Sequence, residues 1–141
     1  MQATICDDER ARQIVTAFYD GGARGDITSF APYLAKDFEL FVPPYLPWGG
    51  HFDRSAYLEL LPRVAATLDF TRLRYISLTV ECSHVVALIE IGVRGTAGTI
   101  VISEHWDIEH DQAIRLRVAY FDPKLLLDQL ALPALDNAAA G

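Results

Sequence analysis

The stretch TIVISEHWDIEHDQAIRLRVAYF, residues 99–121, predicts two antiparallel β-strands joined by a tight turn. Large apolar and polar side chains alternate along it with the two-residue period of a strand. The link from His110 to Gln112 is short enough for a hairpin. Alternation places Glu104 on one face of the first strand, Thr99–Glu109. The other residues of that face are large and apolar: Ile100, Ile102, Trp106 and Ile108. This face is therefore expected to be a core face that holds a single acid.

The sequence before this stretch extends the same pattern. Phe70–Cys82 and Val85–Arg94 are rich in β-branched and aromatic residues, and the links between all these segments are short. Together with Thr99–Glu109 and Ala113–Phe121 they predict an antiparallel meander. The strand from Val85 is apolar on both faces, which favours cover on both. We expect helices on one face and a second subunit on the other, that is, a homodimer formed through the outer face of the sheet.

The first half of the sequence predicts helices. Apolar residues at helical spacing begin at Ala11, and the glycines between 21 and 25 are expected to end that helix. A short helix follows, then a strand at Phe38–Val42 and a turn-rich loop. Asp53 is expected to cap another helix, and Asp122 a last one after the strands. Helices first and a strongly curved antiparallel sheet second give an α+β fold.

Composition excludes several classes of protein. A length of 141 residues fits one domain, over 1–130, with a loosely ordered tail over 131–141. The net charge of -7 disfavours a nucleic-acid partner. No apolar run approaches the roughly 20 residues that span a membrane, and no signal peptide is visible. Cys6 and Cys82 favour free thiols in a reducing compartment. We therefore expect a cytoplasmic protein with neither nucleic acid nor membrane as its partner.

Four motifs carry a resemblance to a known superfamily. They are Gly25-Asp26 after the first helix, LAKDFELFVP (34–43), PWGGHFDRSAYLELL (47–61) and QAIRLRVAYFDP (112–123). With these motifs the chain resembles the nuclear transport factor 2-like (NTF2-like) superfamily, specifically its SnoaL-like branch of polyketide cyclases and ketosteroid isomerase relatives. The resemblance implies a cone-shaped α+β barrel whose sheet wraps a pocket closed by helices. It also implies dimers and acid–base chemistry on small apolar molecules without a cofactor.

The resemblance also assigns roles to individual positions. The aspartate base of ketosteroid isomerases corresponds to Val42 in this chain. Their oxyanion-binding tyrosine corresponds to a position near Phe18, and Tyr19 substitutes for it if the helix is rotated. Their protonated acid corresponds to Glu104. One of three roles is retained, so steroid isomerase activity itself is not expected.

Glu104 is the strongest candidate for catalysis. A carboxyl group on an apolar face should have a raised pKa, because desolvation disfavours its anion. Such a group can serve as an acid, a base or a hydrogen-bond donor. Two structural alternatives remain open at this point: an ion pair with Arg74 or Arg94, and a strand end that reaches solvent.

Further candidates surround it. His51, in the proline–glycine loop, and Tyr19 are proposed as second proton-active groups. Glu90 is either part of the site or paired with Arg94. The residues expected to bind ligand are Phe18, Val42, Tyr45, Trp48, Tyr57, Leu61, Glu90, Trp106 and Tyr120.

His105, Asp107, Glu109 and Asp111 share a strand face, but alternating charge is typical of a solvated face, so no metal is predicted. Two functions follow from these observations. The chain is an enzyme of isomerase, cyclase, dehydratase or hydrolase type acting on a small apolar molecule, or a non-catalytic ligand-binding or dimerisation module of the same fold.

Overall fold

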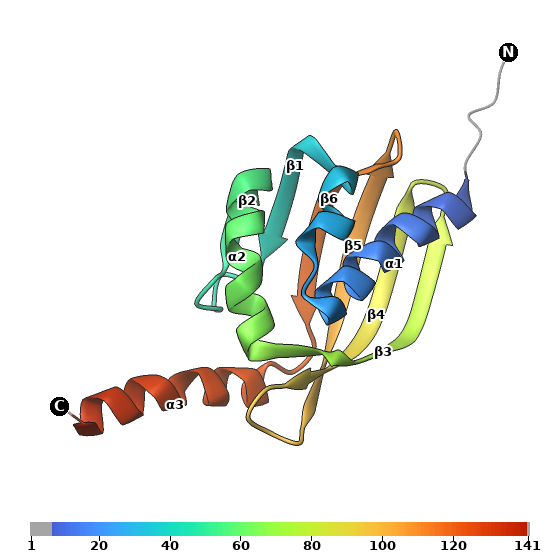
Figure 1. The fold of residues 1–141 in the computed structure, drawn as a ribbon. Coiled ribbons are helices and arrows are strands. Elements are labelled where there is room, and N and C mark those ends of the chain that lie inside the picture. Colours follow the sequence, from blue (N-terminus) through green and yellow to red (C-terminus); the bar gives the residue numbers. More distant parts are fainter. Residues whose placement is uncertain (1–6, 141) are drawn as a thin grey trace, which may run out of the picture.

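The computed structural model describes residues 7–140, with side chains described as far as 132. Its helices are α1 (Asp8–Arg24), α2 (Arg54–Thr67) and α3 (Lys124–Ala140), with 3-10 turns at Ile27–Ser29 and Ala31–Tyr33. Its strands are β1 (Leu34–Val42), β2 (Gly50–Asp53), β3 (Leu68–Glu81), β4 (His84–Val93), β5 (Thr99–Glu109) and β6 (Gln112–Tyr120). α1 and α2 lie against the same face of a curved sheet, and α3 leads away from it (Figure 1).

The sheet contains the predicted meander and two further strands. Its order is β2-β1-β6-β5-β4-β3, and it stays open between β2 and β3. β3 to β6 pair antiparallel, as predicted. β1, whose neighbour was not predicted, runs parallel to β6, so one pairing of the sheet departs from the antiparallel pattern. β2 was not predicted; it begins at the end of the predicted loop and pairs antiparallel with β1.

α1 passes through two of the glycines that were expected to end it. Gly21 and Gly22 lie inside the helix, which ends at Gly25 in the left-handed conformation with φ of 66°. A Cβ atom at Gly21 would lie 2.9 Å from the backbone oxygen of Asp26, and one at Gly22 would lie 3.0 Å from the Phe70 ring. These two glycines therefore allow α1 to approach its neighbours closely rather than end the helix.

The segment after α1 also differs from its prediction. The expected short helix is a pair of 3-10 turns, and β1 begins at Leu34, four residues before the predicted Phe38. Pro32 lies in the first turn of the second 3-10 segment, which fits its fixed φ and missing N–H. The chain can thus turn twice and enter the sheet early.

Both predicted aspartate caps are present. The Asp53 side chain accepts a hydrogen bond from the Ala56 N–H at 2.9 Å, and Asp122 accepts one from the Lys124 N–H at 3.1 Å. α3 is helical as far as Ala140. The side chains of 133–140, and residue 141 altogether, lie outside the described part, so the loose tail stays a prediction.

The two faces of the sheet differ as the alternation predicts. Along β5, Ile100, Ile102, Trp106 and Ile108 are buried beneath the helices. A bulge in β6 shifts the pattern by one residue, so that Ala113 and Leu116 are both buried. The opposite, outer face carries most of the ion pairs of the sheet.

The structure bears on the expectations about the cysteine thiols and about membrane-spanning segments. Cys82 is disulfide-bonded, so the expectation of a free thiol is wrong for this residue. Cys6 lies outside the described residues. No helix within the described part of the chain is long and apolar enough to cross a membrane.

Candidate functional site

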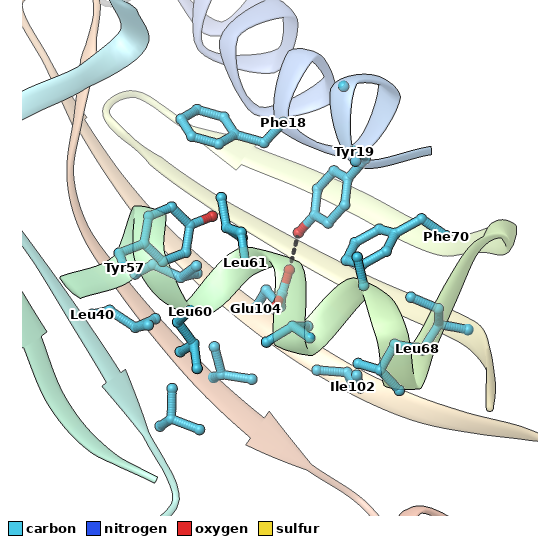
Figure 2. Close-up of a pocket in the computed structure, with 18 of the residues that line it drawn as sticks. Phe18, Tyr19, Leu40, Tyr57, Leu60, Leu61, Leu68, Phe70, Ile102 and Glu104 are labelled. Atoms are coloured by element: carbon cyan, nitrogen blue, oxygen red, sulfur yellow. Dashed lines mark hydrogen bonds between the residues drawn. The ribbon is translucent and has the colours of Figure 1, made fainter. Parts of the chain in front are cut away.

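A cavity of about 270 Å³ lies between the inner face of the sheet and the helices α1 and α2. Its wall is almost entirely apolar and rich in aromatic rings. Figure 2 shows side chains of α1, α2 and the inner sheet face converging on it. This volume is close to the lower end of the 300–1,000 Å³ typical of small-molecule pockets. The cavity can hold a compact organic molecule.

Seven of the residues expected to bind ligand lie on this wall: Phe18, Val42, Trp48, Tyr57, Leu61, Trp106 and Tyr120. Others on the wall were not singled out, among them Phe70, Leu68, Leu60 and Ile102. Leu68 follows α2 directly and opens β3, in line with the helical spacing of Tyr57, Leu61 and Val64, so that apolar spacing was the available signal. Phe70 had no such signal, because its position depends on the close approach of Gly22 across from it.

Glu104 is the one side chain with an ordinarily charged group on the described wall, which includes no Asp, Lys, Arg or His. It projects from β5 between Ile102 and Trp106. The Tyr19 hydroxyl donates a hydrogen bond to its Oε1 at 2.6 Å (Figure 2). The Trp106 indole Nε1–H in turn donates to the Tyr19 oxygen at 3.0 Å. α1 and β5 thus meet in a hydrogen-bonded chain from indole to phenol to carboxyl.

Burial sets the acidity of this carboxyl group. Desolvation raises the pKa of Glu104 from 4.5 to about 7, although the hydrogen bond from Tyr19 opposes the rise. The two arginines considered as partners of Glu104 pair with other carboxylates. Arg74 bonds Glu90 at 3.2 Å, and Arg94 lies 3.7 Å from Asp69. Among the described residues no cation forms a salt bridge with Glu104, so it stays protonated to near neutral pH.

Four tyrosines surround Glu104, and all remain neutral. Burial raises the pKa of Tyr75 to about 12 and raises those of Tyr19, Tyr57 and Tyr120 above their ordinary range. The Tyr57 hydroxyl points into the cavity from α2 (Figure 2). The Tyr75 hydroxyl is buried without a hydrogen-bond partner in the described residues, and its ring packs edge-on against Tyr19 at 5.6 Å. The tyrosines can therefore act as donors, not as bases, near neutral pH.

Three predicted site residues lie away from the cavity. The His51 ring is exposed, stacks on Phe41 at 4.5 Å and approaches Glu39 at 3.2 Å, so it is not placed at the pocket. Tyr45 is half exposed and does not line the cavity. Glu90 lies on the outer face, paired with Arg74 instead of the expected Arg94. Position in a loop or on a strand did not reveal which way these side chains turn.

The acidic and histidine side chains on the outer face of β5 form ion pairs and hydrogen bonds with their neighbours. Asp107 contacts His84 at 2.8 Å and Arg115 at 3.0 Å, and His105 bonds Ser103 at 2.9 Å. Within the described residues no group of three or more potential ligands is arranged to hold a metal ion.

Solved structures with a similar fold were found by comparison of the whole chain. An NTF2-like protein from Burkholderia xenovorans LB400 superposes with a TM-score of 0.70 at 18% identity, over 88% of this chain and 98% of its own. A protein from Kribbella flavida DSM 17836, proposed to be a ketosteroid isomerase, gives 0.70 at 15% identity, over 84% and 83%. The chain has an NTF2-like fold. TerC co-crystallised with polyporic acid shares this fold, with a TM-score of 0.70 at 20% identity over 84% of this chain and 96% of TerC.

At these identities the NTF2-like fold is what the comparisons establish. No family model matches the sequence, and no curated protein matches it. The fold agrees with the resemblance seen in the sequence motifs. The chemistry of the site has to be argued from Glu104 and its neighbours.

Proposed function

We propose that this NTF2-like chain binds a small, largely apolar molecule in its cavity and performs cofactor-free acid–base chemistry on it, as in the SnoaL-like branch. The observation that carries the proposal is Glu104: a carboxyl group without a cationic partner in the described residues, on the wall of an apolar cavity. Its pKa of about 7 lets both the acid and the base form be present near neutral pH.

The geometry assigns distinct tasks to the two carboxyl oxygens. Oε1 is engaged by Tyr19, so Oε2 is the oxygen available to exchange a proton with a bound molecule. Protonated, Oε2–H donates to a carbonyl or hydroxyl oxygen and stabilises the negative charge that develops there. Ionised, Oε2 removes a proton from an adjacent carbon or oxygen. Isomerisation, cyclisation, dehydration and hydrolysis all use such a transfer.

The wall of the cavity would supply orientation and exclude water. Trp48 lines the cavity from the loop after β1. The guanidinium of Arg63 on α2 lies 5.7 Å from its ring, and the Tyr120 hydroxyl on β6 is an interaction partner. Aromatic rings favour flat or cyclic apolar ligands. In a dry site each hydrogen bond to the ligand acts more strongly than in water.

A ligand panel tests binding first. Thermal shift is measured with steroids, polyketide fragments, short fatty acids and polyporic acid, the molecule crystallised with TerC. A ligand at 100 times its dissociation constant adds about 2.7 kcal/mol of stability, which raises the melting temperature by several degrees. The absence of a shift with every compound would contradict a ligand cavity.

Catalysis is tested with molecules that bind. Glu104→Gln keeps the shape of the side chain and removes the exchangeable acid, so turnover should fall at least about 100-fold. Glu90→Gln makes the same change on the outer face and should leave turnover as it was. Equal activity of Glu104→Gln and the unmodified protein would refute the acid–base role.

A non-catalytic binding module is the second candidate, and Val42 favours it. Val42 is buried on the cavity wall where the related isomerases carry their aspartate base. In this case ligands from the panel stabilise the protein, but none is converted, with or without Glu104.

The homodimer remains part of the proposal. Val86 and Leu88 are only half buried on the outer face of β4, which α1 and α2 do not cover. Leu88→Arg should then shift a dimer to monomer in analytical ultracentrifugation. A monomer at micromolar concentration before substitution would contradict the homodimer.

The cytoplasmic location stays a prediction from sequence. The disulfide at Cys82 disfavours it, because disulfides are rare in the reducing cytosol.

A further inference from the structure

The Tyr19 hydroxyl lies between the Trp106 indole and the Glu104 carboxyl group, which differ in whether they can accept a hydrogen bond. The indole of Trp106 has one N–H and can only donate, whereas a phenol has one proton and can also accept. Trp106 Nε1 lies 3.0 Å from the Tyr19 oxygen, and that oxygen lies 2.6 Å from Glu104 Oε1. Because the indole N–H cannot accept a hydrogen bond, the Tyr19 proton is directed to Oε1, the acceptor on the other side of the hydroxyl. The indole of Trp106 therefore sets the donor-to-acceptor direction of both hydrogen bonds.

The second carboxyl oxygen is in a different position. Oε2 of Glu104 has no hydrogen-bond partner among the described residues, yet it is not among the buried polar atoms that lack one. It therefore keeps accessible surface, and Glu104 lies on the cavity wall. That surface faces the space a ligand would occupy.

We propose that Trp106 is a positioning residue: by donating to Tyr19 it commits the Tyr19 proton to Oε1 of Glu104 and leaves Oε2 as the oxygen that meets the bound molecule. The proposal deepens the proposed function and rests on it where a ligand is concerned. Protonated Glu104 then carries its proton on Oε2, so the ligand atom it meets must be a hydrogen-bond acceptor such as a carbonyl oxygen.

The other titratable groups around Glu104 do not compete for this role. Tyr57 faces it from α2, Tyr75 from β3 and Tyr120 from β6, and all three stay neutral because their pKa values are raised. No Lys, Arg or His lies on the described cavity wall. Tyr19 is the one described side chain that hydrogen-bonds the carboxyl group.

Removing the indole N–H should change the acidity of Glu104 in a definite direction. Without it, no donor competes at the Tyr19 oxygen, which becomes a better acceptor of a hydrogen bond from a protonated Oε1 and so stabilises the protonated carboxyl group. The hydrogen bond to the ionised form also weakens, because it is no longer reinforced by the indole. Both effects raise the pKa of Glu104.

The experiment is a ¹³C NMR titration of the Glu104 carboxyl carbon, which needs no ligand. Trp106→Phe should move the midpoint upward by about half to one pH unit, the equivalent of one ordinary hydrogen bond. Trp48→Phe is the matched control, because Trp48 also lines the cavity but interacts with Tyr120 instead. The control should leave the midpoint in place. An unchanged midpoint in Trp106→Phe, or equal shifts in both variants, would overturn the proposal.

Two further variants separate positioning from packing. Replacing Trp106 with benzothienylalanine keeps the bicyclic shape and removes only the N–H, so it should reproduce the upward shift even if Trp106→Phe folds poorly. In a Tyr19→Phe background the same replacement should have no additional effect, since the influence of Trp106 passes through Tyr19. A full shift in that background would also overturn the proposal.

The test of the Trp106 role and the test of the proposed function can fail independently. If the titration shifts as expected and no compound binds, the hydrogen-bonded chain stands and the function fails. If compounds bind and are converted but the Glu104 titration midpoint is the same in the Trp106 variants, the function stands and the role of Trp106 fails.

Discussion

Glu104 and Asp107 lie three residues apart on β5, and the fold gives them opposite chemistry. Glu104 points into the cavity, where its hydrogen-bond partner is a neutral tyrosine and burial raises its pKa to about 7. Asp107 points outward. Its partial burial would raise its pKa, but hydrogen bonds from His84 and Arg115 outweigh this and hold the pKa below the ordinary value.

The difference shows that the face of the sheet, not the residue type, decides what a carboxyl group can do here. On the inner face a proton is held to near neutral pH and can be exchanged. On the outer face the carboxylate is ionised at neutral pH and holds β4, β5 and β6 together through His84, Arg115 and Arg117.

The largest contrast is expected between two neighbouring residues of β5. Trp106 is 1% exposed, and Trp106→Ala should lower the free energy of unfolding by about 3–5 kcal/mol, since it leaves a void in the core. His105 faces outward, and His105→Ala should cost less than about 1 kcal/mol. Urea denaturation of both variants measures the pair, and similar losses would show that β5 has no distinct inner face.

The next contrast is in pH dependence. Because the folded pKa of Glu104 lies above its unfolded value, its contribution to stability is complete below about pH 4.5 and is lost as the pH rises through 7. The rise from 4.5 to about 7 corresponds to about 3 kcal/mol. Glu104→Gln should therefore gain about this much relative to the unmodified protein between pH 4 and 8, as followed by denaturation at each pH. A constant difference would mean that Glu104 titrates normally.

A smaller effect of opposite sign is expected at Asp107. Its folded pKa is depressed, so its contribution is present at neutral pH and is lost as the pH falls through the folded value. Asp107→Asn should cost about 1 kcal/mol at pH 7 and progressively less in acid or at high salt. Chemical denaturation at low and high ionic strength measures this effect. A loss of unfolding free energy that is the same at every pH and salt concentration would refute the ionic explanation.

The smallest effect is expected at Tyr75. Its buried hydroxyl has no partner among the described residues, so Tyr75→Phe should be neutral or raise stability by up to about 1 kcal/mol. Tyr19→Phe is the comparison, because it removes a hydroxyl that bonds both Trp106 and Glu104. It should destabilise by about 1–3 kcal/mol near pH 8, where Glu104 is ionised. Thermal denaturation that ranks the two variants the other way would contradict the assigned hydrogen bonds.

Strand alternation and turn chemistry predicted much of this fold from sequence. The four-stranded meander, the caps at Asp53 and Asp122 and the inward direction of Glu104 all depend on contacts close along the chain. The parallel pairing of β1 with β6 joins segments about 75 residues apart, and alternation within β1 does not specify its neighbour. The passage of α1 through Gly21 depended on a close packing partner that local propensity does not show.

The site was predictable to a similar extent. The apolar face of β5 was sufficient to single out Glu104 and Trp106. The choice between Phe18 and Tyr19 stayed open, because both lie near the core face of α1, and only packing shows which ring reaches the carboxyl group. His51 was misplaced because the proline-rich loop closes into β2, which turns that ring outward onto Phe41.

β5 thus holds one acid on the wall of an apolar cavity and another among cations. Titration of the Glu104 and Asp107 carboxyl carbons by ¹³C NMR in a single sample, with Glu104→Gln and Asp107→Asn for assignment, tests it most directly. We expect a Glu104 midpoint near pH 7 and an Asp107 midpoint below its ordinary 3.8. A Glu104 midpoint near 4.5 would contradict it.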